Sequence, residues 1–81
     1  MARIVVEVMP RAEILDPQGQ AVHAALVRLG LPGVREVRQG KRFVVEVDGE
    51  LDETVLERYR GAADALLANP VIESWTLHAE P

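Results

Sequence analysis

Apolar residues dominate positions 3 to 9, RIVVEVM, where the single acidic residue falls on one side of an alternating pattern. Such alternation is typical of a β-strand, because successive side chains point to opposite faces of a sheet. The spacing places Ile4, Val6 and Val8 on one face and Val5, Glu7 and Met9 on the other. Pro10 cannot donate to a strand ladder, so we expect the strand to end there.

A helical pattern follows from Asp16 to Leu29. Asp16 is a favourable N-cap, and Pro17 suits the first helical position, where no backbone N–H is needed. Gly19 stands where a complete capping box would have Glu or Gln. Glycine in a first turn costs roughly 1 kcal/mol relative to alanine, so we expect Gly19 to permit a close approach to the backbone. The apolar stripe of this helix is Val22, Ala25, Leu26 and Leu29.

Residues 34 to 47, VREVRQGKRFVVEV, predict two strands joined by a tight turn at Gly40 and Lys41. Glycine at the first position of a two-residue loop favours a type II′ hairpin. In that register, residue i lies opposite residue 81 − i. Val37 then faces Val44, and Arg35 faces Glu46 with the opposite charge.

The last part of the chain predicts a second helix and a final strand. Asp52 is the expected N-cap, and the sequence ANP at 68 to 70 is expected to end the helix, because a residue before proline avoids helical geometry. The strand is expected over residues 71 to 79, with Trp75 and Leu77 on one face. The core stripe expected for the helix is Val55, Tyr59, Ala62, Ala63 and Leu66.

The element order β-α-β-β-α-β predicts an α+β fold of the ferredoxin-like class, as one domain over residues 1 to 81. Its four-stranded antiparallel sheet would carry both helices on one face and leave the other face open. That open face is more apolar than contact with water favours, so we expect self-association or a protein partner there. The expected oligomer interface is Val5, Met9, Val37 and Val44.

Charge and composition exclude several classes of function. The chain has 81 residues, no cysteine and a formal net charge of −4, so disulfides, thiolate metal sites and a general nucleic-acid surface are not expected. No apolar run approaches the ~20 residues that span a bilayer, and the N-terminus lacks a signal-peptide pattern. We therefore expect a cytoplasmic protein without nucleic-acid or membrane partners.

Candidate chemistry is sparse. The chain has one serine, two threonines and one tyrosine, and its histidines, His23 and His78, do not form a cluster. No catalytic residues and no bound metal are expected. The sequence RQGKR at 38 to 42 is a candidate for binding an anion or an acidic partner, with a solvent-exposed hairpin tip as the alternative.

Four short segments, in this order and spacing, resemble the PurS family: ILDPQGQAV from residue 14, LG at 29, VRQGKRF from residue 37 and LLANPVIE from residue 66. PurS is the small subunit of phosphoribosylformylglycinamidine synthase, also called formylglycinamide ribonucleotide amidotransferase. The resemblance covers nearly the whole chain.

The resemblance implies a non-catalytic subunit in purine biosynthesis. A glutaminase subunit, PurQ, would release ammonia, and a synthetase subunit, PurL, would use ATP and magnesium to activate formylglycinamide ribonucleotide. The small subunit would form a homodimer or tetramer, join both partners and support ammonia transfer, with no cofactor of its own. The expected partner contacts are Gly19, Arg38, Lys41, Arg42, Asn69, Pro70 and Glu73.

Two other classes of function are weighed beside this one. A dimeric regulatory module of the ACT type would bind a small effector near a glycine turn after the first strand, where this chain offers only Gly19. An acylphosphatase-like enzyme would need a phosphate loop ending in arginine, and MPRAEILDP stands in that place.

Overall fold

Three strands and two helices form the fold over residues 1–80, which are the residues that the computed structural model describes. Pro81, the last residue of the predicted domain, lies outside the described residues. The second helix continues into a π-helical turn, η1. The elements are β1 (Ala2–Pro10), α1 (Pro17–Arg28), β2 (Lys41–Val47), α2 (Glu53–Ala62), η1 (Ala63–Leu67) and β3 (Glu73–Glu80).

The sheet is antiparallel with the strand order β2-β1-β3, so β1 is its central strand. Val5 lies opposite Val44 on β2 and opposite His78 on β3, which fixes the register on both sides. The two predicted faces of β1 are confirmed, because Ile4, Val6 and Val8 all pack in the core beneath α2, and the residues between them do not belong to that core cluster. Of the described residues, the largest fully buried side chains are Ile4, Val5, Val6 and Val8.

The core lies between the sheet and α2. Ile4, Val6 and Val8 form a buried cluster with Ala63 and Ala68. At about 25 cal/mol per Å² of apolar surface removed from water, such burial provides the main favourable contribution to the folding of a small sheet covered by one helix. The partly buried residues packed against the cluster are Phe43, Val45, Val47, Leu51, Leu56, Tyr59, Leu67, Trp75 and Leu77.

The second helix begins as expected and ends differently. The Val55 N–H donates to the Asp52 carboxylate at 2.8 Å, which confirms the N-cap. The prediction that Leu66 packs in the core is wrong, because Leu66 is 78% exposed and Leu67 takes that place. The physical reason is η1, whose wider turn shifts the inward face by about one residue.

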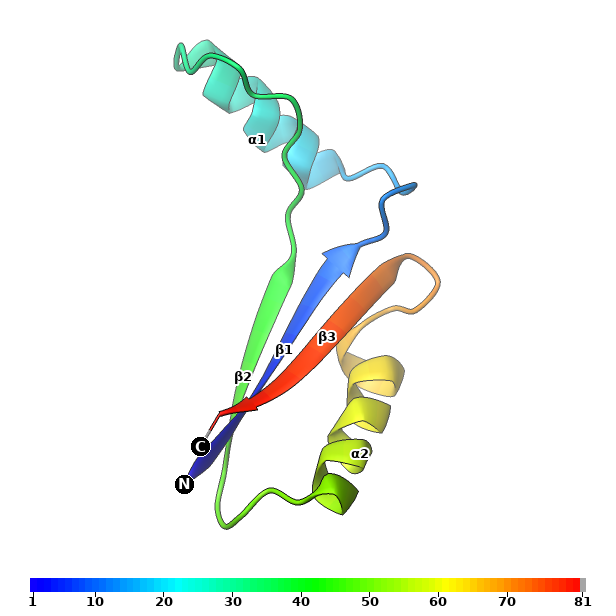
Figure 1. The fold of residues 1–81 in the computed structure, drawn as a ribbon. Helices are drawn as coiled ribbons and strands as arrows, with labels where there is room; N and C mark the ends of the chain where they lie inside the picture. Colours follow the sequence, from blue (N-terminus) through cyan, green and yellow to red (C-terminus); the bar gives the residue numbers. More distant parts are fainter. Residues whose placement is uncertain (81) are drawn as a thin grey trace.

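The predicted hairpin over residues 34 to 47 does not form. Residues 34–40 contain no strand, and β2 begins only at Lys41. The Gln39 N–H, which a hairpin would direct toward the facing strand, donates instead to the Asp16 carboxylate at 2.7 Å. The sheet of residues 1–80 therefore has three strands and not four, and the chain runs straight through Gly40 into β2 (Figure 1).

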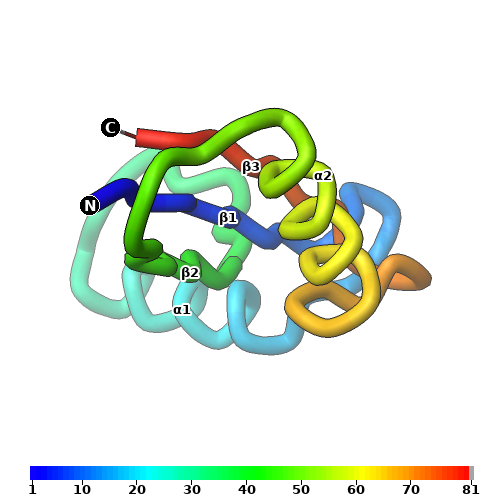
Figure 2. Tube along the Cα trace, turned by 90° about the horizontal axis from the view of Figure 1, so that it is seen from below, coloured from blue at the N-terminus to red at the C-terminus, as the bar shows by residue number. Residues whose placement is uncertain are grey.

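The prediction that both helices cover one face of the sheet is also wrong. Within residues 1–80, α2 and η1 pack on the sheet, whereas α1 lies beyond its end (Figures 1 and 2). The radius of gyration is 16.1 Å, whereas a compact domain of this length has a value of about 12 Å. Consequently the predicted α1 stripe is poorly covered, with Val22 40% and Leu29 76% exposed. Neither helix, nor any other in residues 1–80, is long and apolar enough to cross a membrane.

Substitutions at two glycines test whether the chain runs straight into β2. A Cβ at Gly40 would overlap the Val8 carbonyl oxygen and the Met9 sulfur, whereas a Cβ at Gly61 on α2 would meet no atom within 4 Å. We expect Gly40→Ala to lower the free energy of unfolding by about 1–3 kcal/mol through overpacking. The control Gly61→Ala should raise it by up to about 1 kcal/mol through helix propensity. Urea denaturation of the two variants measures both, and equal stability of Gly40→Ala and wild type would contradict the close packing at Gly40.

Candidate functional site

Two segments predicted to contact partners meet at one end of the sheet. Lys41 begins β2 and Glu73 begins β3, and these two strands flank the end of β1. The Lys41 Nζ lies 3.4 Å from the Glu73 Oε2, and the Glu73 side chain is only 16% exposed. The structure therefore brings Lys41 and the 69–73 segment together into one surface, which we call the sheet end.

The turn over residues 69–73 is held by hydrogen bonds on both sides. Glu73 accepts from the Asn69 N–H at 2.7 Å, and Asn69 accepts from the Val71 N–H at 3.1 Å. The Pro70 carbonyl accepts from the Arg11 guanidinium at 2.7 and 3.1 Å. These hydrogen bonds restrict the backbone of the turn.

Arg11 is a residue that sequence reasoning missed. The signal available was a cation directly after the proline that ends β1. Nothing in the sequence showed that β3 would start beside it, where the Arg11 N–H donates to the Ile72 carbonyl at 2.8 Å. Arg11 therefore joins the 69–73 turn to the end of β1.

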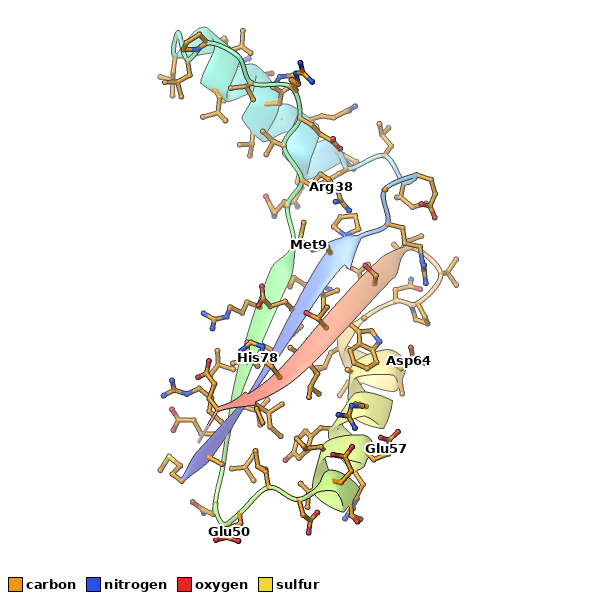
Figure 3. The ribbon with its side chains drawn as sticks, viewed as in Figure 1. Met9, Arg38, Glu50, Glu57, Asp64 and His78 are labelled. Carbon is orange, nitrogen blue, oxygen red and sulfur yellow. The ribbon has the colours of Figure 1, made fainter. Side chains whose placement is uncertain are left out.

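The predicted cluster of cations at a hairpin tip is not present. Arg38 donates to the Pro10 carbonyl, and Figure 3 shows Arg38 above Met9, between α1 and the sheet. Lys41 is paired with Glu73. Arg42 lies opposite Glu7 in the strand register, on the open face of the sheet. Because the hairpin is open, the three cations are spread over different surfaces and do not form one anion site.

The start of α1 is joined to residues 37–39. The Asp16 carboxylate accepts from the Gly19 N–H at 3.1 Å and from the Gln39 N–H at 2.7 Å. Both backbone donors stabilise the charged carboxylate and so lower the pKa of Asp16 below its ordinary value. The Gln39 N–H has the larger effect and the Gly19 N–H the next largest. Gly19 itself is buried, and a Cβ there would overlap the Val37 carbonyl oxygen. The close approach expected at Gly19 is therefore made by the chain's own backbone, and a partner contact at Gly19 stays a prediction.

A surface hollow of about 360 Å³ lies between the start of α1 and residues 35–38. Its lining includes Glu13, Asp16, His23, Arg35 and Arg38, so cations and carboxylates face the same space. The His23 Nε2 forms a hydrogen bond with the Val34 carbonyl oxygen at 2.9 Å. Within residues 1–80, no group of three or more His, Asp or Glu residues is placed to hold a metal ion. The mixed charges of the hollow give it no clear preference for an anion or a cation.

The open face of the sheet has an apolar centre and a charged end. Val5 lies between Val44 and His78 at the centre, and Val44 is 48% exposed. At the charged end, the Arg3 Nη2 lies 3.8 Å from the Glu46 Oε1, and the Arg3 Nη1 lies 3.6 Å from the Glu80 Oε1. Val5 is fully covered by its neighbours and offers no exposed surface of its own.

The open face holds only part of the expected oligomer interface. Met9 lies on it near the sheet end, beside Gly40. Val37 is not on this face, because it belongs to the open segment beside α1 and lines the surface hollow. The expected interface is thus divided between two surfaces, and its contact with a second copy stays a prediction.

The pH dependence of the α1 start follows from the lowered pKa of Asp16. The pKa of Asp16 is lower in the folded chain than its ordinary value of 3.8, which applies to the unfolded chain. The charged carboxylate therefore stabilises the fold at any pH above 3.8. That stabilisation is lost as the pH falls through the lower pKa of the folded chain. In an NMR titration we expect the pKa of Asp16 to be below 3.8 in the wild type and closer to 3.8 in Gln39→Pro, which lacks the donating N–H. The control Gln39→Ala keeps that N–H and should keep the lowered pKa. An unchanged pKa in Gln39→Pro would contradict the bond between Gln39 and Asp16.

Comparisons with known proteins agree on one family. The family model described as "PurS: Phosphoribosylformylglycinamidine (FGAM) synthase" matches residues 3–81. Phosphoribosylformylglycinamidine synthase subunit PurS of Mycobacterium leprae is 58% identical over 80 residues, covering 99% of this chain and 98% of that protein. The structure of PurS from Bacillus subtilis matches with a TM-score of 0.84 and 34% identity, covering 100% of both chains.

A chain in the structure of PurLQS from Thermotoga maritima also matches, with a TM-score of 0.83 and 31% identity, over 98% of this chain and 96% of that one. A match at this level over nearly the full length includes α1 and the open segment as well as the sheet. The chain therefore belongs to the PurS family, the PurS subunits of phosphoribosylformylglycinamidine synthase.

Proposed function

We propose that this chain is the non-catalytic PurS subunit of phosphoribosylformylglycinamidine synthase in purine biosynthesis. It assembles the synthetase subunit PurL with the glutaminase subunit PurQ. The complete enzyme converts glutamine, ATP and formylglycinamide ribonucleotide to formylglycinamidine ribonucleotide, and PurL uses the ATP and magnesium. The protein works in the cytoplasm as one domain over residues 1–81.

The observation that carries this proposal is the match of 98% of the chain to a chain in the structure of PurLQS from Thermotoga maritima. The geometry of the sheet end supports the proposal, because this surface is suited to docking a partner. The 69–73 turn is fixed by Glu73, Asn69 and Arg11, and Lys41 joins it to β2. A preformed turn of this kind loses little conformational entropy when a partner binds.

The chemical need for such a subunit is the protection of ammonia. In water, ammonia is mostly protonated to ammonium, which has no lone pair and cannot displace phosphate from an activated amide. A passage between a glutaminase and a synthetase must therefore be closed to solvent. We propose that this chain supports that passage by fixing the position of its two partners.

We also propose that the chain associates with itself, as a homodimer or tetramer. The four-stranded ferredoxin-like arrangement is proposed to be completed only in that assembly. The exposed apolar residues of α1 support this, because Val22, Val27 and Leu29 are 40%, 54% and 76% exposed in the single chain.

The effector-binding alternative gains no support. An ACT-type site would use a glycine turn after the first strand to approach a ligand, but Gly19 is buried under the Val37 carbonyl. An acylphosphatase-like loop gains none either, since Arg11 is engaged with the Pro70 carbonyl.

Reconstitution tests the proposed function. PurL and PurQ with this chain should form the amidine product from glutamine, whereas PurL and PurQ alone should lose most of that rate. With ammonium salts in place of glutamine, PurL alone should keep its rate, because no transfer between subunits is then needed. Product formation is followed by chromatography. Full glutamine-dependent turnover without this chain would reject the proposal.

A charge reversal at the sheet end tests the docking surface. Lys41→Glu removes a cation and also breaks the pair with Glu73, whereas Glu73→Gln breaks the same pair but keeps the cation and a side-chain oxygen that can accept from the Asn69 N–H. If a partner binds the sheet end through Lys41, Lys41→Glu should weaken complex formation by roughly tenfold or more at ordinary salt, and Glu73→Gln should weaken it much less. Arg58→Glu on exposed α2 is the control and should bind normally. Equal weakening in Lys41→Glu and Glu73→Gln, measured by calorimetry with the other two subunits, would assign Lys41 to intrachain stability alone.

A further inference from the structure

The peptide unit between Pro10 and Arg11 fixes the end of β1 from two sides. Its carbonyl oxygen accepts from the Arg38 guanidinium, and its N–H donates to the Ile72 carbonyl at 2.8 Å. The carbonyl and the N–H of a trans peptide point in opposite directions. Arg38 therefore lies on the β2 side of the strand end, and Ile72 lies on the β3 side.

Arg11 extends this link through its side chain. Its guanidinium Nε and Nη2 both donate to the Pro70 carbonyl, at 3.1 and 2.7 Å. Together with its backbone N–H, Arg11 thus supplies three donors to two carbonyls of the 69–73 turn. A guanidinium is a rigid planar fork, whereas lysine carries a compact point charge on a flexible stem. The position of the turn therefore depends on the shape of this side chain as well as on its charge.

The turn held in this way presents an apolar tip. Val71 is 78% exposed, and its N–H is bonded to the Asn69 side chain at 3.1 Å. A single exposed apolar residue is ordinary on a protein surface. Here, however, the backbone on both sides of Val71 is hydrogen-bonded, and a β-branched side chain has few rotamers to lose. Burial of this tip in a partner therefore needs little further ordering.

The charge of Arg11 indicates the kind of surface that fits this tip. The Lys41 cation is paired with Glu73, but no ion pair of Arg11 is found within residues 1–80. A cation without a carboxylate partner of its own favours a negatively charged counterpart across an interface. The complementary surface is therefore an apolar pocket with a carboxylate at its rim.

We infer that Arg11 is a positioning residue for complex assembly: it holds the 69–73 turn so that Val71 enters such a pocket on the other subunits of the enzyme. This inference rests on the proposed function and names the residue that makes the contact and the residue that fixes it. Arg11 acts through the turn, so its effect on assembly depends on Val71 being present.

Titration of the reconstituted enzyme tests the inference. Arg11→Lys keeps the charge and loses the fork, whereas Val71→Thr keeps the shape and loses apolar surface. Each variant is added to fixed amounts of PurL and PurQ, and glutamine-dependent product formation is followed. We expect the concentration for half-maximal rate to rise about tenfold in each, as for the loss of one interface anchor. The maximal rate should stay at the wild-type value. Arg58→Lys on exposed α2 is the matched control and should give the wild-type curve.

The double variant separates positioning from an independent contact. If Arg11 acts through Val71, Arg11→Lys combined with Val71→Thr should bind no more weakly than the weaker of the two single variants. Additive losses, or a wild-type curve for either single variant, overturn the inference. So does a fall in the maximal rate, because that result places the residue in ammonia transfer and not in assembly.

Hydrogen exchange on the chain alone tests the effect of Arg11 on the turn. The Glu73 N–H donates to the Asn69 carbonyl at 2.7 Å, and its exchange should be faster in Arg11→Lys than in the wild type. Urea denaturation should show nearly equal stability, because the bonds of Arg11 to Pro70 are exposed and water can replace them. Unchanged exchange at Glu73 overturns the positioning role.

Sedimentation distinguishes the proposed partner from a second copy of this chain. Arg11→Lys and Val71→Thr should sediment as the wild type does, and a shift of either toward monomer overturns the inference by assigning the turn to contact between copies. Failure of the wild-type chain to support turnover rejects the proposed function. Turnover with the wild type and an unaffected Arg11→Lys rejects this inference alone.

Discussion

The hydrogen bond from the Gln39 N–H to the Asp16 carboxylate determines how the rest of this chain is arranged. That carboxylate also caps α1 through the Gly19 N–H, so one side chain joins the start of a helix to a segment 23 residues further along. Its pKa is lowered because two backbone donors stabilise the charged form. The donor used here is one that a β-hairpin would need, and the segment before β2 therefore stays open.

An open segment changes what a single copy can bury. The core between the sheet and α2 is complete around Ile4, Val6 and Val8, which are fully covered. Among the described residues, none from 11 to 40 packs in or against this core, and the molecule extends over 48 × 26 × 15 Å. A small chain of this kind stabilises its remaining apolar surface most directly by association. This physical need agrees with membership in a family of enzyme subunits.

The sequence allowed most of the local structure to be predicted, because local rules decide it. The alternation around Val6, the N-caps at Asp16 and Asp52, and Pro10 as a strand end depend on neighbours within a few residues. The failures involve competition between distant groups. A glycine at position 40 favours a hairpin locally, but Asp16 competes for the Gln39 N–H from a distance that no pattern in the sequence reveals.

In the candidate site too, the segments could be predicted from local sequence, whereas the contacts between distant residues could not. The segments around Lys41 and Glu73 could be selected by resemblance and charge, yet their direct pairing depends on the strand order β2-β1-β3. Arg11 was overlooked because its role is to hold the backbone of a turn 59 residues away. Leu66 and Leu67 could not be distinguished by helical spacing, since one π-helical turn shifts the face that packs.

The most direct test of this account is an NMR measurement of the scalar coupling across the hydrogen bond between the Gln39 amide nitrogen and the Asp16 carboxyl carbon. Such a coupling is observed only between groups that share a hydrogen bond, so it identifies the acceptor of the Gln39 N–H directly. We predict a measurable coupling to the Asp16 carboxyl carbon at neutral pH. Its absence, or a coupling from the Gln39 nitrogen to the Arg42 carbonyl carbon as in a closed hairpin, would contradict the account.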